Sequence, residues 1–231
     1  MAIVSGLQGR IRGKLAESVF YGGKGSASYA RAYVAKPKNP KTTRQLVSRE
    51  IFKAASKLVS SVALAVKTTY GDRNKVLGKF AQHEGVVQYS TEGVLTIKYA
   101  DIAAAISTPA LPTPAFGVLD LSGDLSVTIP VPTSMPDYSQ YMEAGAKLAY
   151  VVLVLQPDTL WSKTVVVMDS DLQNGKIVVP VPPIWSGTDV HVYAAVKEVL
   201  PAFNGVPTEQ QPIKYPSKSS AFVYVGRGTI E

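Results

Sequence analysis

The sequence contains no cysteine and only two histidines, His83 and His191. The absence of cysteine excludes thiol catalysis, cysteine-based zinc sites and disulfide bonds. With two histidines, no Gly-x-Ser-x-Gly motif and no clustered pair of carboxylates, the sequence gives no support for a catalytic triad, a metal centre or a glycosidase site. We therefore expect no enzymatic activity, no cofactor and no metal, and we expect His191 to point to the solvent side of a strand.

Long apolar runs are also missing. The longest, residues 58–66, is interrupted by serines and flanked by Lys57 and Lys67, and it falls far short of the roughly 20 residues that span a bilayer. The first residues contain no apolar region that would serve as a secretory signal. We expect a protein without a membrane span that is made in the cytoplasm, where it is used or assembled into a particle.

Charged residues are scarce, at 18% of the chain, and they are unevenly distributed. Residues 1–95 contain 16 Lys and Arg against 5 Asp and Glu, whereas residues 96–231 contain 8 against 12. The first part therefore has a formal charge of +11 and the second part −4. A basic segment of this kind attracts polyanions or the acidic face of another protein.

Residues 1–41 alternate glycines with basic and aromatic side chains, which indicates an arm with one hairpin, 18–21 paired with 26–34. Two functions fit this arm. Its glycines favour docking on a neighbouring subunit by strand addition, and its aromatic and basic side chains would also suit single-stranded nucleic acid. The basic candidates are Arg10, Arg12, Lys14, Lys24 and Arg31.

A helix is predicted for residues 43–70. Residues 42–45 have the pattern of a capping box, in which the Thr42 hydroxyl and the Gln45 side chain satisfy free backbone amides. Asp72 can cap a second, shorter helix that extends to Gln82. Helical spacing in the first helix predicts one buried apolar face, made of Val47, Ile51, Phe52, Ala55, Leu58, Val59, Val62 and Val66.

Arg49, Lys53 and Lys57 are spaced four residues apart and form a basic stripe along this helix, which Arg44 and Lys41 extend toward its start. A row of cations suits phosphate groups or an acidic protein surface. A solvated helix face explains the same pattern without any ligand. The stripe is nevertheless the best candidate for a binding site in this sequence.

From residue 85 onward the apolar residues alternate, and eight strands are predicted: 86–89, 94–98, 125–131, 147–155, 163–168, 176–181, 189–199 and 219–225. The predicted fold is mainly β, α+β overall. It consists of a basic arm and a helical anchor in residues 1–84, then an independently stable antiparallel sandwich of immunoglobulin or fibronectin type III type in residues 85–231. Because residues 147–155 are apolar on both sides, both faces of that strand should be covered, one by a neighbour or by the 43–70 helix.

Two segments are similar to ligand-binding motifs but lack residues that those motifs require. Residues 9–14 lack the spacing and the Ser or Thr of a phosphate-binding loop. Residues 169–175 lack the Gly and Glu positions of a calcium loop, and a hairpin turn at Asn174 and Gly175 explains them better.

Five segments occur in the same order as in a known group of proteins: GRIRGKLAESVFYGGKG, PKNPKTTRQLVSREIFKAASKLVS, IKYADIAAAIS, GTDVHVYAAVKEV and SSAFVYVG. With them the chain resembles an uncharacterised family that is widespread in Bacteroidetes genomes and in associated phages and prophages. The resemblance implies a basic arm and a helix before a fibronectin type III or immunoglobulin-like sandwich, and it implies no catalytic residues. The chain departs from the family after Val199, where residues 200–218 replace a short hairpin turn.

Charge and resemblance together lead to one main hypothesis. It is a non-enzymatic structural protein of a phage or phage-derived particle, located in the virion after assembly in the host cytoplasm, with other copies or other structural subunits as partners. The alternative is a nucleic-acid-binding module that uses residues 1–57.

Overall fold

The computed structural model describes residues 41–69, 72–82, 85–90, 93–107, 109–200 and 218–231, together with the backbone of four short strands before residue 33. The chain divides into two compact units, Met1–Gln45 and Leu46–Glu231. All strand pairs in the described part are antiparallel, and several helices accompany them. The predicted class, α+β with a predominance of antiparallel sheet, is therefore confirmed.

The first unit contains a four-stranded antiparallel sheet in the order β1-β4-β3-β2. Its strands are β1 (Ala2–Val4), β2 (Gly13–Leu15), β3 (Ser18–Gly22) and β4 (Ser28–Ala32). The sequence predicts the β3–β4 hairpin, and the structure adds β1 and β2 to its two outer edges. Strands of the predicted arm therefore pair with one another.

Helix α1 (Thr43–Ser61) begins where the capping box predicts. The Gln45 N–H donates to Thr42 Oγ1 at 3.4 Å, so the threonine half of the box is present. The reciprocal half is missing, because Gln45 Oε1 is buried without a hydrogen-bond partner among the described residues. The Thr42 side chain alone therefore caps the start of the helix.

The predicted single helix of residues 43–70 is interrupted at Val62, and its second part is a separate helix, α2 (Ala63–Thr68). The hydroxyls of Ser60 and Ser61 donate to the carbonyl oxygens of Ser56 and Lys57, one turn earlier, at 3.0 and 3.2 Å. Hydroxyl bonds of this kind weaken and bend helices. The prediction of one continuous helix is therefore wrong.

Helix α3 (Arg73–Ala81) follows as predicted. Asp72 is its N-cap, and its Oδ1 accepts from the N–H groups of Asn74 at 2.8 Å and Lys75 at 3.4 Å. Two otherwise unsatisfied amides at the helix start are thereby bonded. The prediction that Asp72 caps a short helix up to Gln82 is confirmed.

The main sheet has the order β12-β11-β8-β9. Its strands are β8 (Lys147–Leu155), β9 (Ser162–Met168), β11 (Asp189–Val199) and β12 (Val223–Thr229). The two central strands have the predicted limits, whereas β12 begins and ends four residues later than predicted. A second sheet pairs β7 (Ser126–Pro130) with β10 (Lys176–Pro180), and a separate hairpin pairs β5 (Val87–Tyr89) with β6 (Leu95–Ile97).

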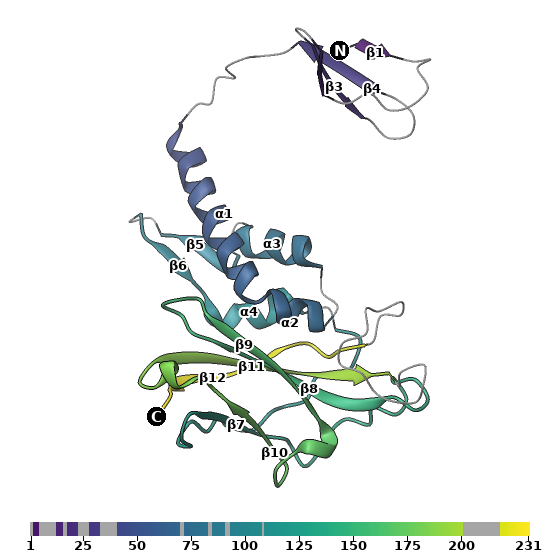
Figure 1. Cartoon of the computed structure of the whole chain (residues 1–231), viewed down its shortest axis with the longest axis vertical. Coiled ribbons are helices and arrows are strands. Elements are labelled where there is room, and N and C mark those ends of the chain that lie inside the picture. The colour runs from purple at the N-terminus through teal and green to yellow at the C-terminus, as the bar shows by residue number, and fades with distance from the viewer. Residues whose placement is uncertain are drawn as a thin grey trace. The chain divides into compact units, whose positions relative to one another are not determined.

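Both faces of the main sheet are covered, one by the helices and the other by β7 and β10, as predicted from strand β8 (Figure 1). Val151 and Leu153 point to one face and pack in a core with the helices, including Leu58 and Phe80. Tyr150 and Val152 point to the other face and pack in a second core with β7 and β10. Residues 46–231 therefore form three layers, with helices, a four-stranded sheet and a two-stranded sheet.

Four short elements were not predicted. They are η1 (Tyr99–Asp101) with the adjoining helix α4 (Ile102–Ile106), η2 (Asp169–Asp171) and η3 (Pro183–Trp185). A helix of five residues is too short to show periodicity in a sequence. The predicted turn after η2 is confirmed, because Asn174 and Gly175 have φ angles of 53° and 70° between the bridged residues Gln173 and Lys176.

The position of the helices differs from the predicted division at residues 84 and 85. Helices α1 to α4 belong to the same compact unit as the sheets, since their apolar side chains share a core with β8 and β11. The other compact unit, Met1–Gln45, contains the four strands β1 to β4 and the first residues of α1. We call residues 46–231 the body of the protein.

Candidate functional site

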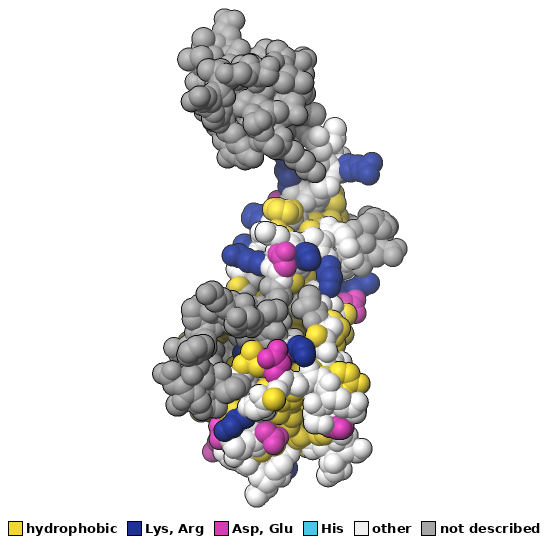
Figure 2. Space-filling model, turned by 90° about the vertical axis from the view of Figure 1, so that its right-hand side faces the viewer, with side chains coloured by type: hydrophobic (Ala, Val, Ile, Leu, Met, Phe, Trp, Pro, Cys, Tyr) yellow, Lys and Arg dark blue, Asp and Glu magenta, His cyan; other side chains and the backbone are white. Residues whose placement is uncertain are grey.

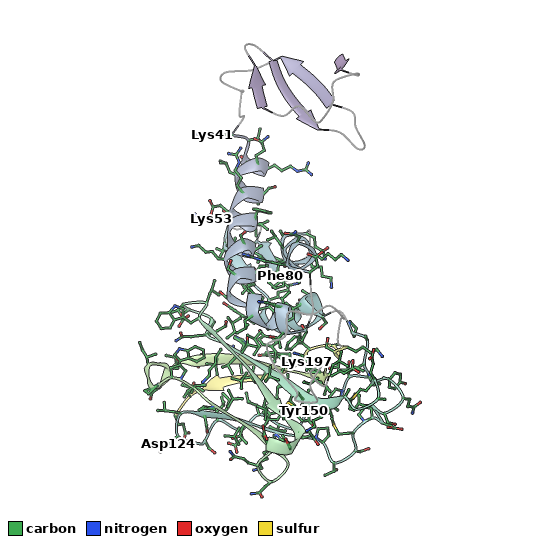
Figure 3. All side chains as sticks on the ribbon, turned by 45° about the vertical axis from the view of Figure 1, so that its right-hand side comes forward. Lys41, Lys53, Phe80, Asp124, Tyr150 and Lys197 are labelled. Atoms are coloured by element: carbon green, nitrogen blue, oxygen red, sulfur yellow. The ribbon has the colours of Figure 1, made fainter. Side chains whose placement is uncertain are left out.

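The predicted basic stripe lies on α1 and is exposed. Arg49, Lys53 and Lys57 all belong to this helix and are exposed, as are Arg44 and Lys41 at its start. On the face shown in Figure 2, Lys and Arg side chains gather over the helical end of the body. Figure 3 shows Lys53 on α1, well apart from Tyr150 in the sheet layers. The stripe is thus a row of solvent-exposed cations.

The first half of α1, residues 43–54, contains no buried side chain. Burial begins at Ala55 and continues with Leu58 and Val59. Leu46 and Phe52 are large apolar residues that are 45% and 54% exposed. The prediction that Phe52 lies on the buried face is therefore wrong. Helical spacing alone places it beside the apolar face, but among the described residues of α1 the apolar side chains that pack on the core begin at Ile51 and do not include Phe52.

A pocket of about 580 Å³ lies between α1, the β5–β6 hairpin and the turn between β8 and β9. We call it the α1–β6 pocket. It is lined by Glu50, Lys53, Ala54, Lys57, Tyr89, Gly93, Leu95, Ile97 and Leu160. Two members of the predicted stripe therefore line a concave site, whereas the sequence predicted only a row of charges.

The β5–β6 hairpin explains why this site is hollow. Val87 pairs with Ile97 and Tyr89 pairs with Leu95, so these four side chains share one face of the hairpin. The pair at the base belongs to the core, where Val87 is buried and Ile97 is half-buried. The pair toward the tip is exposed and lines the pocket. The hairpin is therefore packed at its base and open at its tip.

The charges of the pocket are unbalanced. The ammonium groups of Lys53 and Lys57 lie one helical turn apart and have no hydrogen-bond or ion-pair partner among the described residues. Glu50 contributes one carboxylate to the lining. Two cations and one anion surround an apolar floor, so the pocket favours an anionic group next to apolar surface.

The candidate residues of the first unit are not brought into this site by any described contact. Lys14 lies on β2 and Arg31 on β4, where only the backbone is described. Arg10, Arg12 and Lys24 lie outside the described residues. The binding roles of all five stay predictions.

His191 is buried rather than solvent-facing, so that prediction is wrong. It is 8% exposed, and its Nδ1 lies 2.9 Å from the Tyr224 hydroxyl. Burial lowers its pKa below the ordinary value of 6.5, the charge of Arg227 lowers the pKa further, and Asp189 acts in the opposite direction. Alternation along β11 predicts two faces, but the helical layer covers the face that the sequence suggests is exposed.

Glu198 is a buried carboxylate that sequence reasoning did not single out. It is 1% exposed, and its Oε1 accepts from the Glu143 N–H at 2.6 Å while its Oε2 accepts from the Lys218 N–H at 3.0 Å. Lys218 Nζ in turn donates to the Tyr141 carbonyl oxygen at 2.5 Å. This carboxylate therefore joins the turn before β8 to the chain before β12, which is a structural role.

The described residues contain no group of three or more His, Cys, Asp and Glu side chains arranged to hold a metal ion. Within the same part of the chain, no helix is both long and apolar enough to cross a membrane. Comparisons with protein-family models, curated proteins and solved structures found no match to this chain. The family resemblance inferred from the sequence segments therefore stays a prediction.

Proposed function

We propose that this protein is a non-enzymatic structural subunit of a phage or phage-derived particle, assembled in the host cytoplasm and anchored through its basic first unit and α1. One observation supports the anchor above all. The first half of α1 contains no fully buried residue, and it presents the exposed side chains of Leu46 and Phe52 together with basic side chains. A lone helical segment is marginal in water, so a partner that covers these exposed apolar side chains would stabilise it.

The body supports the structural part of this proposal. The two central strands of its main sheet, β8 and β11, are buried on both faces by other parts of the body. The α1–β6 pocket lies beside α1. In this proposal, the first unit and α1 bind the partner, and the sheets of the body form a rigid support.

The finer fold assignment is part of the same proposal: the sheets correspond to an immunoglobulin or fibronectin type III sandwich. The order β9-β8-β11-β12 matches strands C′-C-F-G, and the β7–β10 pair matches strands B and E. Residues 117–120 run beside β7 where strand A would lie. The Gly117 N–H donates to the Pro130 carbonyl oxygen at 3.0 Å, and Asp120 and Thr128 exchange backbone bonds at 3.0 and 2.9 Å.

The experiment is quantitative mass spectrometry of particles purified on density gradients from a phage-producing host, before and after nuclease treatment. We expect the protein at fixed stoichiometry in nuclease-resistant particles. Leu46→Ser combined with Phe52→Ser should reduce its incorporation, while Leu64→Ser is the matched control because Leu64 is an exposed apolar residue on α2. Recovery of the protein only outside particles would contradict the proposal.

The alternative, a nucleic-acid-binding module, is supported by the spacing of Arg49, Lys53 and Lys57 on one exposed helix face. It predicts binding of DNA or RNA at about 0.15 M salt, with log affinity falling steeply against log salt concentration because each contact releases counterions. Release of the protein from particles by nuclease, together with such a slope, would favour this alternative over the structural role.

A further inference from the structure

The apolar floor of the α1–β6 pocket indicates a ligand that buries side chains. Ala54, Ile97 and Leu160 form this floor with the exposed pair Tyr89 and Leu95. Apolar side chains left in water around a concave surface favour a ligand that covers them. A phosphate backbone would leave this floor uncovered, so the floor favours a protein segment over nucleic acid.

The charges of the pocket indicate a single carboxylate. Lys53 and Lys57 project from successive turns of α1 and lack partners among the described residues, so an anion placed between them would contact both. Glu50 lines the same pocket and repels a ligand with several negative charges in a row. One Asp or Glu side chain therefore fits better than a polyanion.

The hairpin edge indicates an extended backbone. Strand β6 pairs only with β5 among the described strands, so one edge of it has no β-strand partner there. An extended segment can add to such an edge through main-chain hydrogen bonds while its alternate side chains enter neighbouring pockets. In that arrangement, alternate side chains of the added segment would lie beside Leu95 and Ile97, on the same face of the hairpin.

We propose that the α1–β6 pocket binds an extended segment of a partner protein in which one Asp or Glu is flanked by apolar side chains. The carboxylate lies between Lys53 and Lys57, and the apolar side chains cover Tyr89, Leu95 and Leu160. This inference rests on the proposed structural role, because it specifies the kind of subunit surface to which the anchor attaches. The apolar floor would contribute most of the affinity for this segment, and Lys53 and Lys57 would select segments that contain a carboxylate.

The test is selection of a randomised peptide display library of eight-residue segments on the immobilised full-length protein. We expect enriched peptides to contain an acidic residue flanked by apolar residues, without proline at the pairing positions. Their affinity should fall at least about tenfold in a Lys53→Glu, Lys57→Glu variant, because each substitution turns an attraction into a repulsion. The matched control is Lys67→Glu with Lys75→Glu, which changes two exposed lysines on α2 and α3 outside the pocket and should leave affinity within about twofold.

Circular dichroism and urea unfolding must first show that both double variants are folded. The milder pair Lys53→Gln and Lys57→Gln should also weaken binding, and Leu95→Ser should do so without a change in charge. Enrichment of basic peptides, or equal enrichment on the protein and on the Lys53→Glu, Lys57→Glu variant, would overturn the inference.

Two other occupants are tested with the same variants. Self-association that disappears in the Lys53→Glu, Lys57→Glu variant during sedimentation would identify a second copy of this chain as the occupant and overturn the proposal. Lysine-dependent binding of a DNA duplex in competition with the peptides would overturn it as well. If no peptide is selected while incorporation into particles still depends on Leu46 and Phe52, the pocket inference fails and the proposed structural function survives.

Discussion

The imidazole of His191 stacks on the ring of Tyr99, with centroids 4.3 Å apart and an angle of 11° between the planes. Tyr99 belongs to η1 in the helical layer, and His191 belongs to β11 in the main sheet. The Tyr193 hydroxyl strengthens the same junction by donating to the Tyr99 carbonyl oxygen at 2.8 Å. A titratable ring therefore lies where the two layers meet.

The first prediction concerns the pH dependence of this junction. Because burial lowers the pKa of His191 in the folded protein, the unfolded chain binds more protons between that pKa and 6.5. The free energy of unfolding should therefore fall as the pH decreases through about 6.5, where an unperturbed histidine is half protonated. Urea unfolding from pH 7.5 to 5.5 measures this, and His191→Gln should flatten the dependence. An equally steep dependence in the variant would show that another group is responsible.

The second prediction compares two apolar residues of α1. Leu58 is fully buried in the core between the helices and the sheet, so Leu58→Ala should lower the free energy of unfolding by about 2–5 kcal/mol. Phe52 is exposed, and Phe52→Ala should change it by less than about 0.5 kcal/mol. Urea unfolding followed by circular dichroism gives both values. Equal losses in the two variants would mean that α1 is packed along both halves.

The third prediction concerns the buried carboxylate of Glu198. Glu198→Gln removes the charge that accepts from two backbone N–H groups and presents an amide donor to one of them. The free energy of unfolding should fall by about 1.5–3 kcal/mol, as for a hydrogen bond to a charged group. Glu143→Gln is the control, because its exposed side chain can change with little effect. A neutral Glu198→Gln substitution would show that these bonds are not needed.

The fourth prediction replaces the expectation that residues 85–231 are stable alone. A fragment of residues 46–231 should fold, because it contains both cores. A fragment that starts at Gly85 should expose Val151, Leu153 and Tyr193 to water and should be aggregated or loosely packed. Near-ultraviolet circular dichroism and size-exclusion chromatography distinguish the two. A native-like, monomeric 85–231 fragment would restore the original expectation.

The strands of the sheets could be predicted because residue type and alternation within a few neighbouring residues determine them. β8 and the centre of β11 are rich in Val, which favours strands, and a strand with two apolar sides requires cover on both. Asp72 and Thr42 were predictable for the same reason, since a cap acts within three residues. The break at Val62 was missed because serine hydroxyls compete with the helix only through their rotamers, which a sequence does not give.

The candidate site could be predicted only in part. The spacing of Lys53 and Lys57 places them on one helix face, but the partners of that face are more than thirty residues away in sequence, at Tyr89, Leu95 and Leu160. The burial of His191 was missed for a related reason. Alternation along β11 distinguishes the two faces of the strand, but it does not show that η1 covers one of them.

The alternation of β8 side chains between two cores has a thermodynamic consequence. Val151 and Val152 are adjacent in the chain, yet one contacts the helical layer and the other contacts the second sheet. Loss of packing in either layer would remove the apolar contacts on one side of this strand. Although the body has two separate cores, they share one backbone, and we expect it to melt in a single cooperative transition.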